Sequence, residues 1–232
     1  MSESLWIVQE ARPVRVAYQG IAGAFSEEAV HRCWHGRAVA YPTSTFAAAL
    51  DAVVKGDVEC GIIPTWNSTI GSITSACAAL HDHAATLVQE CEVDLPVRHC
   101  LLARAGTMLD DVRYVGSHPA ALAQCSRLFD GTRPFVACEA FDTAGAALEL
   151  SRYGVTTDGD LEPWYARLPD SDAAHLAVIA SARAGERYGL IVLQGDVQDD
   201  PTNLTRFTVV RAVTTVAAAV HDAKRTTPYL SS

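Results

Sequence analysis

The strongest constraint on the fold of this chain is a regular alternation of strand-like and helix-like segments. Residues 14–18 read VRVAY, whose alternation is typical of a short strand, and a glycine-bearing turn and a helix start at Ser26 follow it. A strand followed by a helix recurs within residues 38–56 and again within residues 113–154. Because such alternation is typical of domains in which helices connect the strands of a mostly parallel sheet, the sequence predicts an α/β fold.

The strand–helix units form two successive groups, which predicts two lobes. Lobe 1 is expected to comprise residues 14–95 and 197–212, and lobe 2 residues 96–196. The segment 155–172 is rich in Asp, Thr, Gly and Pro and is predicted to form a surface loop. Residues 213–232 are predicted to form a C-terminal tail that includes a short helix.

Composition limits the classes of partner that the chain can bind. Its formal net charge of -9 provides no general electrostatic surface for nucleic acid. No apolar run approaches the roughly 20 residues that span a bilayer, and the first residues do not read as a signal peptide, so we expect a cytoplasmic protein without a membrane partner. The seven cysteines include no Cys-x-x-Cys pair and are expected to be free thiols, and no metal site is predicted.

Seven short motifs follow one another along the chain. They are YQGIAGAFSEEA (18–29), GIIPTWNSTIGS (61–72), HCLL (99–102), GSHPAALAQC (116–125), DTAGAA (142–147), AVIAS with RYGL (177–181 and 187–190) and NLTRF (203–207). Together, and in this order, they resemble the catalytic domain of the prephenate dehydratase family.

The resemblance implies a two-lobed fold of the type II periplasmic-binding-protein kind, with the active site in the cleft between the lobes. It implies decarboxylative dehydration of prephenate to phenylpyruvate, an aromatisation that needs neither cofactor nor metal. The substrate would be a small anion, and the assembly a homodimer or a larger homo-oligomer.

Thr205 matches the family's threonine that assists departure of the substrate hydroxyl. A threonine hydroxyl is a poor acid, but it can donate a hydrogen bond to a developing hydroxide. The alternative is an ordinary strand threonine, because β-branched residues favour strands. The NLTRF context favours the catalytic interpretation.

The two residues after Thr205 are substrate-binding candidates of different kinds. Arg206 could pair with a carboxylate of the substrate or of a neighbouring lobe. In a strand, however, Thr205 and Arg206 face opposite sides, so a structural role for Arg206 is an equal alternative. Phe207 is expected to form the cleft wall or core.

The polar loop after the third predicted strand is the next binding candidate. Asn67, Ser68, Gly71 and Ser72 match the family's loop, and a polar loop that enters a helix can present N–H groups to a carboxylate. The alternative is a simple capped turn. Gln19, ahead of Gly20, is expected where the backbone approaches the substrate closely.

Two predicted helix starts could bind anions for the same reason. Ser117 and His118 open one helix, and Asp142 and Thr143 open and cap another. His118 could be a general acid, although a His beside a helix-starting Pro is more often a cap or a surface residue. His99 lies in an apolar run and is expected to be a buried, satisfied histidine.

Two departures from the family pattern stand out. The family usually has Glu where this chain has Trp66, which could line the site and change the ligand or could simply pack. Residues 212–232 are too few for the phenylalanine-binding regulatory domain of many members, so no regulatory domain is predicted.

The departure at Trp66 leaves several functions open. The alternatives are a dehydratase or decarboxylase acting on a modified prephenate or on arogenate, and, in another class, a small-molecule binding or sensor protein on the same fold. Thr205 argues against decarboxylases that retain the hydroxyl, and NLTRF argues against a sensor.

Overall fold

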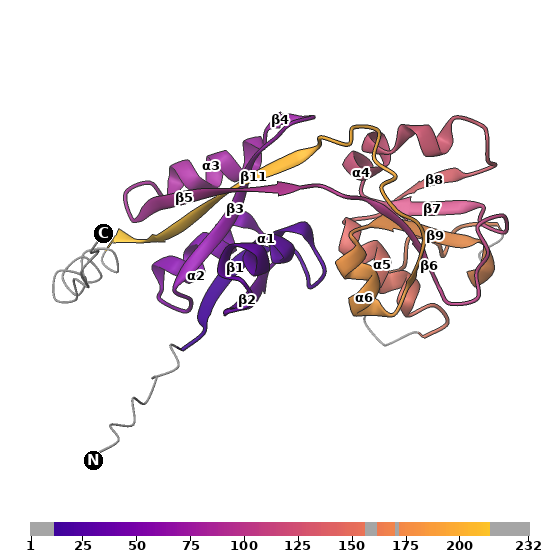
Figure 1. Ribbon diagram of the computed structural model, residues 1–232. Helices are drawn as coiled ribbons and strands as arrows, with labels where there is room; N and C mark the ends of the chain where they lie inside the picture. The colour runs from indigo at the N-terminus through magenta and orange to yellow at the C-terminus, as the bar shows by residue number, and fades with distance from the viewer. Residues whose placement is uncertain (1–11, 156–161, 170–171, 214–232) are drawn as a thin grey trace, which may run out of the picture.

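The computed structural model describes residues 12–155, 162–169 and 172–213, which form two lobes, each built around one β-sheet (Figure 1). The predicted tail and its helix lie outside the described residues, apart from residue 213. The elements of lobe 1 are β1 (Val14–Gln19), α1 (Phe25–Trp34), β2 (Ala38–Thr43), α2 (Phe46–Val54), β3 (Cys60–Asn67), β4 (Gly71–Ser72), α3 (Thr74–Asp82), β5 (Leu87–Pro96) and β11 (Leu204–Ala212).

Lobe 2 is formed by the middle of the chain. Its elements are β6 (Cys100–Ala103), β7 (Tyr114–Ser117), α4 (Pro119–Gln124), η1 (Ser126–Phe129), β8 (Val136–Glu139), α5 (Thr143–Ser151), η2 (Ala173–His175), β9 (Leu176–Ala180), α6 (Ala182–Tyr188) and β10 (Ile191–Gln194). The predicted α/β fold with two lobes is thus confirmed, whereas the predicted residue boundaries of the lobes stay a prediction.

Each sheet is mixed rather than mostly parallel. In lobe 1 the strand order is β2-β1-β3-β11-β5, with β4 paired to β3; β1 is parallel to β2 and β3, and β11 is antiparallel to β3 and β5. In lobe 2 the order is β10-β6-β9-β7-β8, with β6 antiparallel to β9 and β10. The sequence pattern missed this because strands that enter a sheet from the other lobe need no helical crossover and can pair antiparallel.

Helices cover both faces of each sheet. In lobe 1, α2 and α3 pack on one face around Leu50 and Ile63, and α1 packs on the other around Val30 and Ile62. In lobe 2, α5 and α6 cover one face and α4 the other. The residues at the start of β3 are all buried, as is typical of a strand covered on both faces.

Part of the predicted surface loop 155–172 belongs to the core of lobe 2. Tyr165 is buried, and the Trp164 N–H donates a 2.9 Å hydrogen bond to Glu149 of α5. The Trp164 ring lies where a Cβ on Gly116 would come within 2.5 Å, so β7 needs a glycine there. The polar composition of this segment gave no indication that Trp164 and Tyr165 pack into the core.

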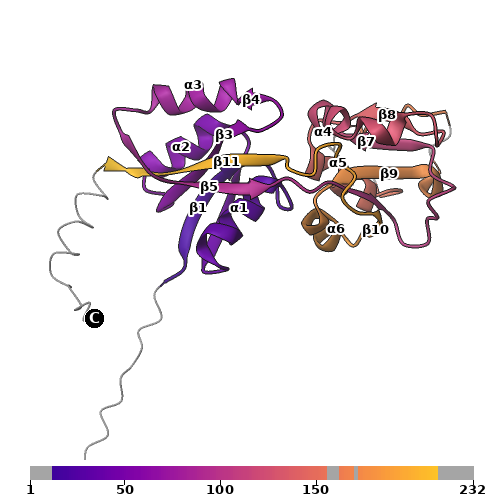
Figure 2. The same cartoon turned by 45° about the horizontal axis from the view of Figure 1, so that its top comes forward.

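Two segments, residues 97–99 and 195–203, connect the lobes and hydrogen-bond to each other. The Val97 N–H donates to the Asn203 carbonyl (2.8 Å), and the Val197 N–H donates to the His99 carbonyl (2.9 Å). Figures 1 and 2 show β5 and β11 leading toward lobe 2 side by side. No helix in the described part of the chain is long and apolar enough to cross a membrane.

The lobes also touch away from these connections. The Ser181 hydroxyl at the start of α6 donates to the Gly23 carbonyl (2.9 Å), the Tyr188 hydroxyl donates to the Ala22 carbonyl, and Arg183 lies 3.5 Å from Glu27. These contacts join α6 to the loop before α1 and help to fix the angle between the lobes.

Candidate active site

A hollow of about 200 Å³ lies between the lobes, and residues from both line it. We call it the first hollow. Its lining residues are Phe25, Ser26, Pro64, Asn67, Ile70, Ile73, Val97, His99, His118, Ala120, Ala121, Gln124, Thr143, Thr205 and Phe207.

Thr205 and Asn67 face each other across paired strands in this hollow. Thr205 on β11 is in register with Asn67 at the end of β3, and both side chains are largely buried. The Asn67 amide nitrogen donates to the Thr205 hydroxyl oxygen over 3.0 Å. Because that oxygen already accepts a hydrogen bond, the Thr205 proton is directed elsewhere and is available as a donor.

The backbone fixes the orientation of the Asn67 amide. Its carbonyl oxygen accepts the N–H groups of Thr69 (2.9 Å) and Ile70 (3.2 Å), so its NH₂ group must face β11. That NH₂ group has two hydrogens and three acceptors within reach, Asn203 Oδ1 (2.8 Å), the Leu204 carbonyl (3.0 Å) and the Thr205 hydroxyl (3.0 Å), so one hydrogen is shared between two of them.

This network of hydrogen-bonded side chains continues into lobe 2. Asn203 donates to Gln124 Oε1 (2.9 Å), and His99 Nε2 lies 3.2 Å from the same oxygen. Since Gln124 Oε1 can only accept, His99 must carry its proton on Nε2. Burial lowers the pKa of His99, which favours the same neutral form. The polar network therefore spans both connecting segments and reaches α4.

Two helix starts meet the first hollow in different ways. No side chain caps α1, which begins at Phe25 and Ser26 on the wall of the hollow. By contrast, His118 caps α4, because its Nδ1 accepts the Ala120 N–H over 3.1 Å. The cap interpretation of His118 thus holds, and its Nε2 remains as a hydrogen-bonding group.

A second hollow lies next to the first at the start of α5. Asp142 lines the second hollow, and Thr143, the next residue, lines the first. The lining residues of the second hollow are Gln19, Gly20, Ile21, Pro42, Thr43, Ser44, Phe141 and Asp142. One Asp142 oxygen accepts the Gly145 N–H and thereby caps α5. The sequence-predicted residue Gln19 lies here rather than beside Thr205.

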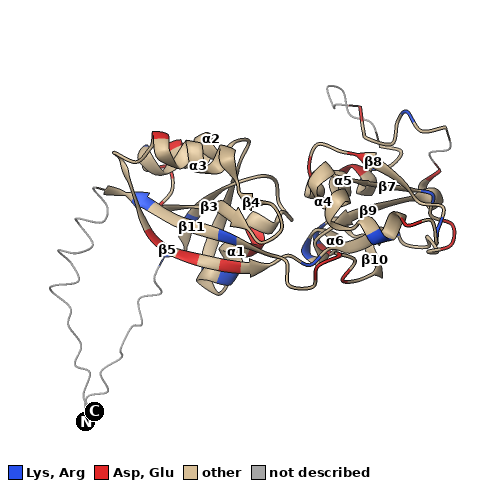
Figure 3. Cartoon of the chain, turned by 90° about the horizontal axis from the view of Figure 1, so that it is seen from above, with Lys and Arg blue, Asp and Glu red and all other residues tan. Residues whose placement is uncertain are grey.

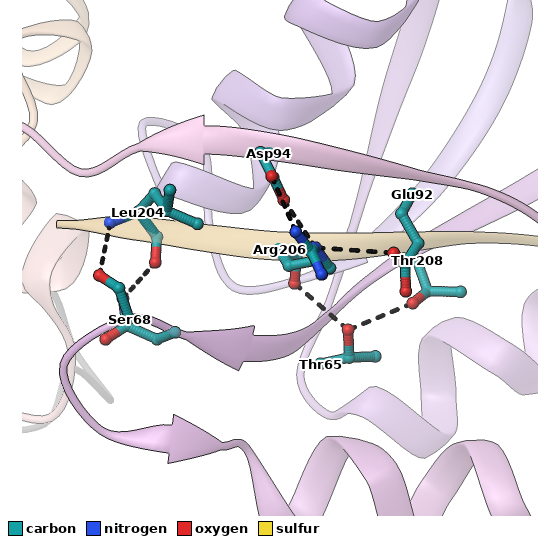
Figure 4. A network of polar contacts seen from close by, with 8 residues as sticks. Thr65, Ser68, Glu92, Asp94, Leu204, Arg206 and Thr208 are labelled. Carbon is teal, nitrogen blue, oxygen red and sulfur yellow. Dashed lines mark hydrogen bonds and ion pairs between the residues drawn. The ribbon is translucent and has the colours of Figure 1, made fainter. Parts of the chain in front are cut away.

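Trp66 and Arg206 lie outside both hollows. The Arg206 guanidinium binds Asp94 through two hydrogen bonds (2.8 and 3.0 Å) and lies 3.6 Å from Glu92 (Figure 4). It also stands 5.9 Å from the centre of the Trp66 ring. The hydrogen bonds hold the pKa of Asp94 below its usual value. Of the alternatives for Arg206, the geometry favours the structural one.

Four other predicted binding residues also lie outside the first hollow. Ser117 is fully buried and donates to the Ile179 carbonyl over 2.7 Å. The Ser68 hydroxyl accepts the Leu204 N–H over 3.0 Å, and Gly71 and Ser72 form β4. The N–H groups of residues 68–70 bind protein acceptors, so they are not free for a carboxylate.

Sequence reasoning missed part of the lining. Gln124 lies in the motif GSHPAALAQC, yet its polar side chain in a short helix gave no signal of its own. Ile70 and Ile73 look like ordinary apolar residues, and only the turn into α3 brings them to the cleft. Within residues 12–155, 162–169 and 172–213, no cluster of three or more His, Cys, Asp or Glu could hold a metal ion.

Comparison with known proteins gives one consistent family. The prephenate dehydratase family model matches residues 16–215. Arogenate dehydratase/prephenate dehydratase 2 of Arabidopsis thaliana, called chloroplastic, is 38% identical over 201 residues, which are 86% of this chain and 47% of that protein. Arogenate dehydratase 2 of Petunia hybrida is 38% identical over 199 residues, 85% of this chain and 45% of that protein.

Two solved structures share the fold. GqqA, described as a novel type of quorum quenching acylase, has a TM-score of 0.70 and 30% identity, and the match covers 85% of this chain and 63% of GqqA. Prephenate dehydratase from Arthrobacter aurescens in complex with L-Phe has a TM-score of 0.69 and 26% identity, with 86% and 60% covered.

The names of the relatives correct the predicted location. Several are called chloroplastic, which contradicts the prediction of a cytoplasmic protein. That prediction rested on the first residues of the sequence, and this chain spans less than half the length of those relatives. Its first residues therefore say nothing about a targeting segment. The matches in sequence over residues 16–215 and in structure are sufficient to conclude that the chain belongs to the prephenate dehydratase family.

Proposed function

We propose that this domain catalyses decarboxylative dehydration of prephenate, with arogenate, its amino analogue, as the alternative substrate. The observation that carries the proposal is the oriented Thr205 hydroxyl, whose oxygen accepts from Asn67 and whose proton is free to donate within the first hollow. Family membership gives the reaction class, and the names of several relatives favour arogenate as the second candidate.

The reaction breaks two bonds on opposite ends of a cyclohexadiene ring. Thr205 donates a hydrogen bond to the hydroxyl oxygen on C4, which stabilises the charge that develops as the C4–O bond breaks. The electron pair of the bond between C1 and the ring carboxylate enters the ring, and carbon dioxide leaves. The departing hydroxide takes a proton from solvent and becomes water.

The walls of the first hollow suit this chemistry. Ile70, Ile73 and Phe207 give one apolar side. A carboxylate held against apolar atoms loses hydration, whereas carbon dioxide needs none, so such a wall favours decarboxylation. The uncapped start of α1 at Phe25 and Ser26 offers N–H groups to a substrate carboxylate.

Asn67 and its partners would act as positioning residues. The backbone N–H groups of Thr69 and Ile70 orient Asn67, and Asn67 orients Thr205. A preoriented donor does not reorganise during the reaction, which is the main source of electrostatic catalysis. Neutral His99, held by Gln124, belongs to this support rather than to proton transfer.

A direct assay tests the proposal. Purified protein is incubated with prephenate or arogenate, and phenylpyruvate or phenylalanine is measured, the former by its absorbance in alkali. Formation of either aromatic product supports the proposal, and folded protein without turnover of either substrate contradicts it. A non-aromatic product that retains the hydroxyl would identify a decarboxylase, and ligand binding without any product would identify a sensor.

The same preparation addresses an acylase activity, which the description of GqqA raises. Amide hydrolysis by a side-chain nucleophile needs a base within hydrogen-bonding distance of that nucleophile. The Thr205 hydroxyl has Asn67 as its partner, and no described histidine or carboxylate is hydrogen-bonded to the hydroxyls of Ser26, Thr143 or Thr205. Release of a fatty acid from an acylated amine would contradict this assignment.

A further inference from the structure

Two cysteines that the proposed function does not use lie side by side in lobe 1. Cys33 is in the last turn of α1, and Cys91 is in β5. Their thiols are hydrogen-bonded to each other, and both are free. Neither cysteine belongs to the seven motifs that resemble the family, so the resemblance implies nothing about this pair.

The periodicity of α1 places Cys33 on the side of the helix that packs against the sheet. Cys33 follows the fully buried residues Ala29 and Val30 by four and three positions, the spacing that brings helical side chains onto one face. It packs against the core cluster that these residues form with β1, β3, β5 and β11. The Cys33 side chain is therefore held against the sheet and only partly exposed.

The register of β5 places Cys91 on the face of the sheet that α1 covers. Cys91 pairs with Val209 of β11, and Val93, two residues further on, pairs with Phe207. Alternate residues of a strand share a face, and Val93, Phe207 and Val209 all pack in the same core cluster as α1. Because β5 is the edge strand of this sheet, Cys91 faces α1 and is still exposed to solvent.

Two thiols in contact can be oxidised to a disulfide. A disulfide needs Cβ atoms roughly 3.5–4.5 Å apart, which side chains already in hydrogen-bonding contact can reach by small rotations. Burial and the neighbouring thiol raise the pKa of Cys33, which disfavours Cys33 as the first attacking thiolate, whereas Cys91 is open to an external oxidant. Cys60 is also near Cys33, but it is fully buried, and burial raises the pKa of its thiol to about 12.

We infer that Cys33 and Cys91 form a reversible disulfide, with a small-molecule disulfide such as oxidised glutathione as the oxidant. The Cys91 thiolate attacks one sulfur of the small disulfide, which gives a mixed disulfide and releases one small thiol. The Cys33 thiolate then attacks the Cys91 sulfur, and the second small thiol leaves. The two cysteines lose two electrons and two protons, and the small disulfide gains them as it becomes two thiols. The inference goes beyond the proposed function and does not depend on it.

The cross-link joins the last turn of α1 to β5 and closes a long loop. That loop contains β2, α2, β3, β4 and α3. A cross-link over a long loop stabilises a fold mainly because it restricts the unfolded chain. Since α1 begins at the wall of the first hollow, oxidation also fixes the far end of the helix whose N–H groups face the substrate.

Mass spectrometry and thermal unfolding test for the disulfide. The folded full chain is incubated with oxidised glutathione, and the remaining thiols are alkylated. We expect a loss of two hydrogens and a cross-linked peptide that joins Cys33 to Cys91. The midpoint of thermal unfolding should rise by about 5–15 °C and return with dithiothreitol.

Two variants serve as controls. Cys91→Ser should show neither the cross-link nor the redox-dependent midpoint. Cys138→Ser should behave as wild type, because Cys138 lies in β8 of lobe 2, where its thiol donates to the Val136 carbonyl over 3.6 Å.

Several results overturn the inference. They are a glutathione adduct that persists on Cys91 while Cys33 stays free, a cross-link between Cys33 and Cys60, and folded wild-type protein in which both Cys33 and Cys91 stay reduced. A cross-link that leaves the midpoint unchanged or lowers it also overturns the inference, because the disulfide then does not fit the folded geometry. None of these measurements uses turnover, so a failure of the proposed function leaves the inference unaffected.

Discussion

The two lobes share one sheet topology but present different groups to the cleft. In lobe 1 the order β2-β1-β3 continues with antiparallel β11 and then β5, and in lobe 2 the order β8-β7-β9 continues with antiparallel β6 and then β10. The sequence contains no visible repeat, so this similarity exists in the fold alone. The antiparallel strand is in each case next to a connection between the lobes, as Figure 2 shows for β11.

The difference lies in how the helices begin. In lobe 2 the side chains of His118, Asp142 and Ser181 cap α4, α5 and α6. In lobe 1 Thr45 caps α2, but neither α1 nor α3, which begin at the first hollow, has a side-chain cap. Lobe 1 thus offers free backbone N–H groups together with Thr205 and Asn67, whereas lobe 2 supplies side chains that close its own helices. We expect chemistry to depend on lobe 1 and selectivity on lobe 2.

The strongest test of this difference between the lobes is the variant Thr205→Ala. The variant loses the donor to the leaving oxygen, so we expect kcat to fall by about 10²–10³-fold, the usual effect of removing one such donor, with little change in KM. Steady-state kinetics with the preferred substrate measures both. Thr208→Ala is the matched control. Thr208 is on the same strand but does not line the hollow, and its hydroxyl lies 3.2 Å from the Thr65 hydroxyl. Equal activities of wild type and Thr205→Ala would remove Thr205 from the mechanism.

A substitution at a buried hydrogen bond of lobe 2 should lower stability rather than turnover. Ser117→Ala removes the buried donor to the Ile179 carbonyl, which joins β7 to β9. Leaving that carbonyl without its partner should lower the free energy of unfolding by about 1–3 kcal/mol. Urea denaturation measures the loss, and Ser126→Ala, whose 2.7 Å bond to Asp199 is exposed, should cost less. A fall in kcat without loss of stability would place Ser117 in the reaction.

Two histidines, His99 in a connecting segment and His83 in lobe 1, should make stability depend on pH in opposite ways. Burial lowers the pKa of His99 below its unfolded value of about 6.5, so the unfolded chain binds more protons as the pH falls. The stability associated with neutral His99 is therefore complete above the unfolded pKa and is lost as the pH falls toward the folded pKa. His99→Gln should flatten the loss of stability on acidification, measured by urea denaturation from about pH 7.5 to pH 5.

His83 should behave in the opposite way. Burial alone would lower its pKa, but both ring nitrogens face acceptors, the Ala79 carbonyl (2.8 Å) and Asp51 (3.1 Å), and the net shift is upward. Its stabilising contribution is complete below the unfolded pKa and is lost as the pH rises through the folded pKa. His83→Gln should therefore reduce stability most at the acidic end. The same pH response in both variants would refute the assignment of a neutral His99.

Features that depend on neighbouring residues in the sequence could be predicted, whereas features that depend on contacts between distant segments could not. Local patterns located strands, because the alternating run VRVAY falls within β1. Antiparallel β11 could not be inferred from such patterns, since its neighbours β3 and β5 lie more than a hundred residues earlier in the chain. The motif NLTRF pointed to Thr205, whereas nothing local indicated that Asn67 would be its partner.

The candidate site shows the same limit. Trp66 stood out because the family usually has Glu there, yet strand alternation turns it toward Arg206, on the face opposite Asn67. Asp142 looked like a helix cap and is one, but its place beside the second hollow depends on how two lobes meet. Motifs identify residues, whereas their surroundings come from contacts between distant segments.

The smallest expected effect tests which face of β11 matters. Figure 3 shows basic residues of β11 beside acidic residues of β5, and Arg206 belongs to this exposed pairing. Because exposed ion pairs contribute little, Arg206→Gln should change kcat/KM by less than about twofold. Phe207→Leu, one residue further on, reshapes a wall of the first hollow and should alter KM more. If Arg206→Gln impaired turnover as much as Phe207→Leu, the division of β11 into a reactive face and a structural face would be wrong, and Trp66 would have to be reconsidered with it.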